Sequence, residues 1–397
     1  MERLRTTRRD PRGMMLNLGI LGLCTSCAAG GSEERVFVET LGTDTLAVEQ
    51  YFRTGDRIEG RRITRLGATQ IVHYVADLGA EGDISRLSVD WMTPAENPDG
   101  PAPRSAIVTM NGDSATVELT GGDNAGTTSI AVTEHTIPMV GLTPLALGLF
   151  EHAVMQGVES GQDSMAVDLL YPGRQRLLPN KVVRFGGDSV RMDYFGMPIL
   201  ASVNEDGELT GRSGEETTMK VMTHAVQSVD IDALASDFAS RDARGEGIGT
   251  PSPTAEVQAT LGPATIEITY SQPAARGREI WGGLVPYGEV WRTGANAATS
   301  FTTSRDLMIG DQRVPAGSYT LWSTFTADSA TLVINSQTGQ WGTQYDMEQD
   351  FVRVPLERET LDEPVERFTI DIVETDAGGA LQLTWDDARY SVPIRIP

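Results

Sequence analysis

The chain is 397 residues long and carries 55 acidic against 32 basic residues, a formal net charge of −23 at pH 7. This charge argues against nucleic acid and anionic membrane surfaces as partners, because both repel an acidic protein at long range. The length exceeds that of one ordinary β-sandwich and predicts an export segment followed by two domains. Both cysteines, Cys24 and Cys27, fall near the amino terminus, so neither a disulfide framework nor a cysteine metal site is expected in the folded domains.

Residues 1–29 are predicted to form a signal peptide of the lipoprotein type. Five arginines precede the apolar run MMLNLGILGLC, which is too short to span a bilayer. The run ends in LCTSCAAGG, where a bacterial lipoprotein signal would place its acylated cysteine, and Cys27 is the candidate because two small residues precede it. The alternative is an ordinary signal cleaved near residues 28–30. Both readings predict an exported protein, and the first anchors it to a membrane of the cell envelope, facing the periplasm or the exterior.

Residues 34–241 are predicted to form a mainly β first domain. Short alternating stretches, such as residues 164–171, are separated by turn residues and indicate a curved antiparallel sheet. One helix is predicted over residues 143–157, with Thr143 as its N-cap and Pro144 at its first helical position. A sheet wrapped around one helix is similar to the half-barrel of exported lipid carriers and assembly factors, an analogy of element order that assigns no function.

The four histidines of the chain all lie in this first domain, at His73, His135, His152 and His224. None of them forms an H-x-x-x-H or H-E-x-x-H spacing. We therefore expect packed or exposed histidines, with no metal site and no catalytic role.

Residues 242–253 are rich in Gly and Pro and are predicted to link the two domains. Clean alternation then begins, for example over residues 265–270 and 319–325, and turn residues separate the stretches at short spacing. No helical pattern competes with it. An antiparallel β-sandwich over residues 254–397 is the expected fold.

Three sequence blocks in this second domain, RGREIWGGLVPYG, VWRTGAN and VPAGSY, occur in order. With them the chain resembles a bacterial exported family catalogued as domain of unknown function 2911, over about residues 252–374. The resemblance implies export and no particular activity.

The irregular segment 271–300 concentrates the residues suited to recognition. Arginine guanidinium groups bind carboxylates or sulfates, and aromatic rings offer flat faces for stacking. An asparagine amide both donates and accepts hydrogen bonds. The alternative is structural, with the tryptophans closing the end of the sandwich and Arg292 and Asn296 bonding loop carbonyls. The candidate ligand-binding residues are Arg276, Arg278, Trp281, Tyr287, Trp291, Arg292 and Asn296.

The leading hypothesis for function is a non-catalytic ligand-binding or assembly protein of the cell envelope. The sequence offers no nucleophile–base pair, metal cluster or phosphate loop, so no cofactor is expected, and a glycan, a peptide or an apolar small molecule is the expected partner. One alternative is a hydrolase of envelope or extracellular polymers that uses Glu279, Glu289 and Asp306. Another is a carrier that holds an apolar molecule in the first domain, beside Leu145, Leu149 and Phe150.

Overall fold

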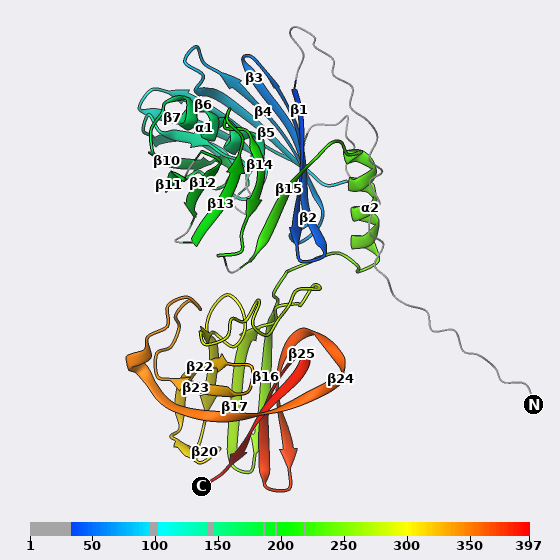
Figure 1. Cartoon of the computed structure of the whole chain (residues 1–397), viewed down its shortest axis with the longest axis vertical. Helices are drawn as coiled ribbons and strands as arrows, with labels where there is room; N and C mark the ends of the chain where they lie inside the picture. Colours follow the sequence, from blue (N-terminus) through cyan, green and yellow to red (C-terminus); the bar gives the residue numbers. More distant parts are fainter. Residues whose placement is uncertain (1–32, 95–101, 142–145, 186, 195–196, 218) are drawn as a thin grey trace, which may run out of the picture.

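The computed structural model describes residues 33–94, 102–141, 146–185, 187–194, 197–217 and 219–397. The expected signal peptide with Cys27, and the expected helix start at Thr143 and Pro144, lie outside these residues. Within them the chain is mainly β, as the sequence predicted, and its strands form two sheets (Figure 1). No described helix is both long enough and apolar enough to cross a membrane.

The first domain is built on one sheet of 15 strands. Its first eight strands follow one another as an antiparallel meander: β1 (Glu33–Leu41), β2 (Asp44–Thr54), β3 (Arg57–Thr64), β4 (Gln70–Leu78), β5 (Ile84–Met92), β6 (Arg104–Asn111), β7 (Ser114–Thr120) and β8 (Gly126–Ala131). The other strands form a second run: β9 (Thr136–Pro138), β10 (Ser164–Tyr171), β11 (Arg176–Phe185), β12 (Ser189–Tyr194), β13 (Met197–Val203), β14 (Leu209–Ser213) and β15 (Val221–Val226), with the 3-10 turn η1 (Pro172–Arg174) between β10 and β11. The two runs join where β15 pairs with β1, and β9 pairs in parallel with β10.

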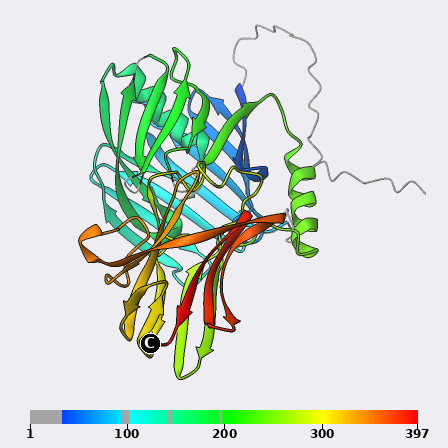
Figure 2. The ribbon, with the colours of Figure 1, turned by 60° about the horizontal axis from the view of Figure 1, so that its bottom comes forward.

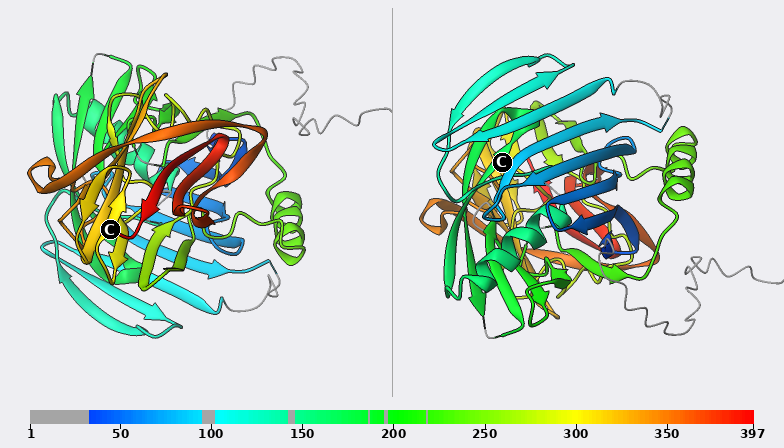
Figure 3. Two further views of the ribbon diagram at one scale, coloured as in Figure 1. Left: turned by 90° about the horizontal axis from the view of Figure 1, so that it is seen from below. Right: turned by 90° about the horizontal axis from the view of Figure 1, so that it is seen from above.

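The sheet curves around the helix α1 (Leu147–Glu159), as Figures 1 and 3 show. Leu149 and Phe150 pack into one hydrophobic core with side chains of the sheet, including Phe37 and Val108. The helix has no side-chain cap of its own. Instead the buried carboxylate of Glu49, on β2, accepts the first free backbone N–H groups of the helix. The predicted sheet around one helix is therefore present, and the sheet itself caps the helix.

A second helix, α2 (Ile231–Ala243), corrects the expectation of a single helix in this domain. Asp230 caps it by accepting the backbone N–H of Ala233. The buried residues Ile231, Ala235 and Phe238 pack against Ile63 of β3 on the outside of the sheet. Only three of its residues are buried, so its apolar pattern is too sparse to identify the helix from sequence. The helix takes up the first two residues of the predicted linker, and the next strand begins at Thr254.

The strands of the second domain pair into one sheet, which folds over and encloses one hydrophobic core. Ile268, Leu332 and Leu383, from three different strands, all contact that core. Figure 2 shows the long strand β24 in orange running across the domain to β25 in red. The elements are β16 (Thr254–Leu261), β17 (Ala264–Ser271), β18 (Val290–Trp291), β19 (Thr299–Thr303), β20 (Leu307–Ile309), β21 (Gln312–Val314), β22 (Gly317–Phe325), β23 (Ala330–Asn335), η2 (Met347–Gln349), β24 (Asp350–Thr375) and β25 (Gly378–Arg395).

Candidate functional site

The irregular segment between β17 and β19 meets the first domain. The backbone N–H of Thr43, in the turn between β1 and β2, donates to the carbonyl of Arg276 at 2.9 Å. A Cβ added at Gly42 would lie 2.2 Å from that carbonyl oxygen, so only glycine fits at this approach. The segment predicted to carry recognition chemistry therefore forms part of a domain interface.

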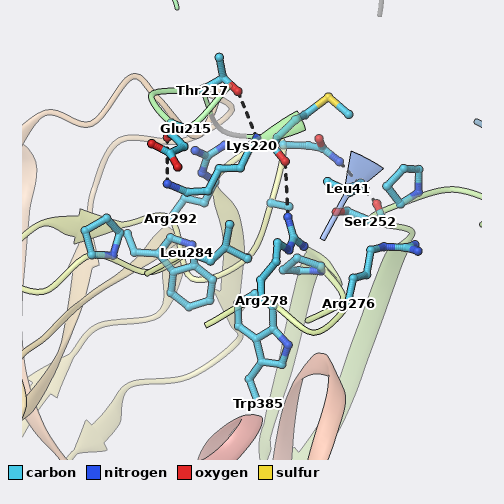
Figure 4. A pocket seen from close by; sticks show the side chains of 18 of the residues that line it. Leu41, Glu215, Thr217, Lys220, Ser252, Arg276, Arg278, Leu284, Arg292 and Trp385 are labelled. Carbon is cyan, nitrogen blue, oxygen red and sulfur yellow. Dashed lines mark hydrogen bonds between the residues drawn. The ribbon is translucent and has the colours of Figure 1, made fainter. Parts of the chain in front are cut away.

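A cavity of about 540 Å³ lies at this interface (Figure 4). This volume falls in the range of about 300–1,000 Å³ that small-molecule sites occupy. Figure 4 shows that the first domain contributes Leu41, Thr217 and Lys220, while the loop of the second domain contributes its arginines. Of the seven candidate residues, five line the cavity: Arg276, Arg278, Trp291, Arg292 and Asn296.

Arg276 and Arg278 fasten the two domains together. The Arg276 guanidinium pairs with Asp44 of β2, and its backbone has a φ of 51° in the left-handed region. The Arg278 guanidinium donates to the carbonyls of Ala274 at 2.6 Å, Ala275 at 3.0 Å and Met219 at 3.4 Å. Burial, followed by the nearby charge of Arg276, lowers the pKa of Arg278. Both arginines therefore have partners within the protein.

Trp281 and Trp291 belong to an aromatic cluster that closes the end of the sandwich. Trp291 stacks on Trp385 with ring centroids 5.9 Å apart, and Trp281 lies 4.8 Å from Phe325. An edge of Trp291 still lines the cavity, whereas Trp281 and Tyr287 are not among its lining residues. The structural alternative therefore accounts for both tryptophans.

Arg292 differs from the other two arginines of the loop. It is partly buried in the cavity wall, and within the described part of the chain no hydrogen bond or ion pair reaches its guanidinium. Burial lowers its pKa, and no acidic neighbour opposes that shift. Its aliphatic stem packs on Gly342, where an added Cβ would lie 2.3 Å from the Arg292 Cδ. The expectation that Arg292 bonds loop carbonyls is not met.

Asn296 sits beside the cavity with a φ of 60°. Its amide nitrogen makes two long contacts, 3.4 Å to the hydroxyl of Ser271 and 3.5 Å to the carbonyl of Ser252. Its amide oxygen has no hydrogen-bond donor within the described ranges. The side chain can therefore accept a hydrogen bond from a ligand.

Trp341 is a cavity residue that the sequence analysis did not select. Its side chain is 52% exposed and lines the cavity. The chain around it is held against the loop, because the N–H of Gly342 donates to the carbonyl of Asn296 at 2.9 Å and that of Ala298 to Gln340 at 3.2 Å. The Trp-Gly pair lies more than forty residues beyond the loop, and no local pattern joins the two segments.

The charges around the cavity are mixed. Its cations are Arg276, Arg278, Arg292 and Lys220, and its carboxylates are Glu215, Glu216 and Glu289. Lys220 donates to the backbone carbonyl of Glu215 at 3.0 Å and pairs with no carboxylate among the described residues. In an acidic protein, Arg292 and Lys220 thus place two positive charges at the cavity with no carboxylate partner among the described residues.

The three carboxylates of the hydrolase hypothesis are not gathered at this cavity. Glu289 lines it, but Glu279 and Asp306 do not. Asp306 is bonded to Arg313 at 2.5 Å and to the N–H of Ala316 at 3.0 Å, and the Arg313 hydrogen bond lowers its pKa. Asp306 therefore supports a turn next to β20.

The residues named for the apolar carrier hypothesis pack into the core where the structure describes them. Leu149 and Phe150 are buried in the hydrophobic core of the first domain, and Leu145 lies outside the described residues. A second cavity, next to Val154 and Gly157, is about 20 Å³, close to the size of one water molecule.

His152 is a packed histidine of the first domain. His152 is buried, with Nε2 2.7 Å from the carbonyl of Gly82 and Nδ1 2.6 Å from the Arg53 guanidinium. Burial lowers its pKa, which favours the neutral ring. No group of three or more His, Cys, Asp or Glu residues within the described ranges is placed to hold a metal ion.

Comparison with known proteins places only the second domain in a family. Residues 252–394 match the family described as "Protein of unknown function (DUF2911)", which confirms the resemblance and extends it into β25. No curated protein sequence matches the chain.

Solved structures similar to the chain include two of unknown function. One is a DUF1089 family protein from Pseudomonas aeruginosa, 14% identical, with a TM-score of 0.31 over 42% of this chain and 89% of the other. The other is a beta-barrel-like protein of the domain of unknown function DUF1849 from Brucella abortus, 13% identical, with a TM-score of 0.34 over 49% of this chain and 96% of the other.

Proposed function

From the premise that the second domain matches the DUF2911 family, we propose that this chain is a non-catalytic binding protein of the cell envelope. Its site is the cavity between the two domains, and its ligand carries a negative charge. The protein is exported and anchored to the envelope through a lipid on Cys27.

The observation that carries the proposal is the Arg292 guanidinium. A charged group that leaves bulk water loses solvation, which is costly unless an opposite charge or hydrogen-bond acceptors replace the water. Arg276 and Arg278 have such partners, whereas Arg292 faces a cavity of ligand size without one. An anion bound there would complete its coordination with charge-assisted hydrogen bonds.

The shape of the site supports binding over catalysis. Carboxylate chemistry needs two acidic groups at a defined separation across a substrate. Of the carboxylates named for it, only Glu289 lines the cavity. The lining also contains Glu215 and Glu216, together with four cations, an amide and aromatic rings, and the cations, the amide and the rings are groups that hold and orient a ligand.

The test is calorimetric titration of the full chain, purified in detergent, with a panel of carboxylated, sulfated and phosphorylated small molecules and their uncharged analogues. We expect at least one anion to bind and Arg292→Ala to weaken it by roughly 10- to 100-fold, the equivalent of about 1.5–3 kcal/mol for hydrogen bonds to a charged group. Arg305→Ala is the matched control, because Arg305 is exposed and does not line the cavity. Equal losses in both variants, or no anion bound by the wild type, would refute the proposal.

A further inference from the structure

Three kinds of group share the interdomain cavity. Arg292 and Lys220 are cations without acidic partners among the described residues. Glu289 and the amide oxygen of Asn296 are acceptors that no described donor satisfies. Trp341 adds a half-exposed indole.

Each kind of group selects a property of the ligand. A planar guanidinium matches a planar carboxylate through two parallel hydrogen bonds. Carboxylate and amide acceptors need donors from the ligand, and hydroxyl groups supply them. The three glutamates in the lining disfavour a ligand with dense negative charge, such as a polyphosphate, because like charges repel in a confined site.

The exposed indole selects a ligand with a flat apolar face. An exposed tryptophan on a polar surface combines a large apolar ring with a polar edge, which suits a ligand that is apolar on one face and polar around its rim. A sugar ring has this property, since its C–H bonds gather on one face and its hydroxyls surround it.

We infer that the ligand is an acidic saccharide, a sugar that carries a carboxylate, with the carboxylate on Arg292, hydroxyls on Glu289 and Asn296, and the ring face on Trp341. This inference rests on the proposed function and narrows it to one ligand class. A peptide that binds as an added strand is a poorer fit, because β18, the strand in the cavity wall, has only two residues with which to pair.

The test is calorimetric titration of the full chain with digalacturonate, its methyl ester, glucose 6-phosphate and a short peptide with a free carboxyl terminus. We expect digalacturonate to bind most tightly and the ester to bind at least about tenfold more weakly, since the ester removes the charge and keeps the ring. Trp341→Ala should weaken binding by about tenfold, and Trp341→Phe should recover part of the loss, because Phe restores a flat face. Because Trp341 is 52% exposed, both variants are expected to fold.

The outcomes separate the two proposals. If glucose 6-phosphate or the peptide binds as tightly as digalacturonate, and Arg292→Ala abolishes that binding, the saccharide inference is wrong and the anion site stands. Binding of digalacturonate that is unchanged in Trp341→Ala also overturns the saccharide inference. If none of the four probes binds, and no other anion does, both proposals fail.

Discussion

Gly342 decides the position of Arg292, the cavity arginine for which the described part of the chain supplies no partner. An added Cβ at this residue would meet the Arg292 Cδ at 2.3 Å and the carbonyl oxygen of Asn296 at 2.5 Å. Both distances are shorter than van der Waals contact, so the arginine stem and the loop backbone would have to move together. The absence of a side chain at Gly342 is therefore a condition for the geometry of the site.

Gly342→Ala is expected to destabilise the second domain by about 1–3 kcal/mol, the usual cost of overpacking. Urea unfolding followed by tryptophan fluorescence measures this, because five of the six tryptophans lie in that domain. Gly55→Ala is the control, since nothing lies within 4 Å of an added Cβ there. If Gly342→Ala lowers the unfolding free energy no more than the control does, the loop accommodates the added methyl group without destabilising the domain.

The helix α1 depends on the sheet for its first turn. Ala146 at its N-cap offers no side-chain acceptor, and the Glu49 carboxylate accepts the N–H groups of Leu147 and Gly148 at 2.9 Å each. The same carboxylate accepts the Tyr74 hydroxyl at 2.7 Å and pairs with the buried Arg62. Helix and sheet thus share one buried ionic network, which continues through Arg62 to Glu39 and Arg212.

Glu49→Gln is expected to cost about 3 kcal/mol of unfolding free energy, because it leaves buried Arg62 without one of its two carboxylates while the amide oxygen still accepts a hydrogen bond. Urea unfolding followed by far-ultraviolet circular dichroism measures the change. Glu118→Gln on the exposed side of β7 is the control and should stay within about 0.5 kcal/mol of wild type. If Glu49→Gln behaves like Glu118→Gln, the network contributes no net stability.

At the scale of the whole molecule, the two domains are held by the loop that also lines the cavity. Arg276 and Arg278 reach the first domain at Asp44 and Met219, while no described residue pairs with the Arg292 guanidinium. Residues that join the domains and residues that line the cavity therefore lie on one segment. A ligand in the cavity would touch both domains, since Lys220 comes from one and Arg292 from the other.

The proposed lipid anchor is also a property of the whole molecule. In a bacterial host that processes lipoproteins, the wild-type chain should fractionate with membranes and incorporate a fatty-acid analogue. Cys27→Ala should lose both properties, because the acylated thiol is gone, and Cys24→Ala should keep both. Labelling of Cys27→Ala, or a wild-type chain that remains unlabelled, would contradict the anchor at Cys27.

The sequence by itself determined the β character of both domains and the presence of the helix α1. It also singled out the irregular segment 271–300, part of which lines the cavity in the structure. These are local properties, because alternation with a period of two and the turn residues between strands act over a few neighbouring residues. A match between short sequence blocks likewise identified the family of the second domain.

The tertiary structure alone decided which side chains of the loop have hydrogen-bond or ion-pair partners among the described residues. Arg276, Arg278 and Arg292 are the same residue type in one segment. They differ only in their contacts, because Asp44, Met219 and carbonyls of the loop lie within reach of the first two. The same holds for Trp341, which backbone hydrogen bonds bring to Asn296 from far along the chain, and for the capping of α1 by Glu49. Burial and pairing depend on contacts between distant segments, and a pattern read along the chain contains no information on those contacts.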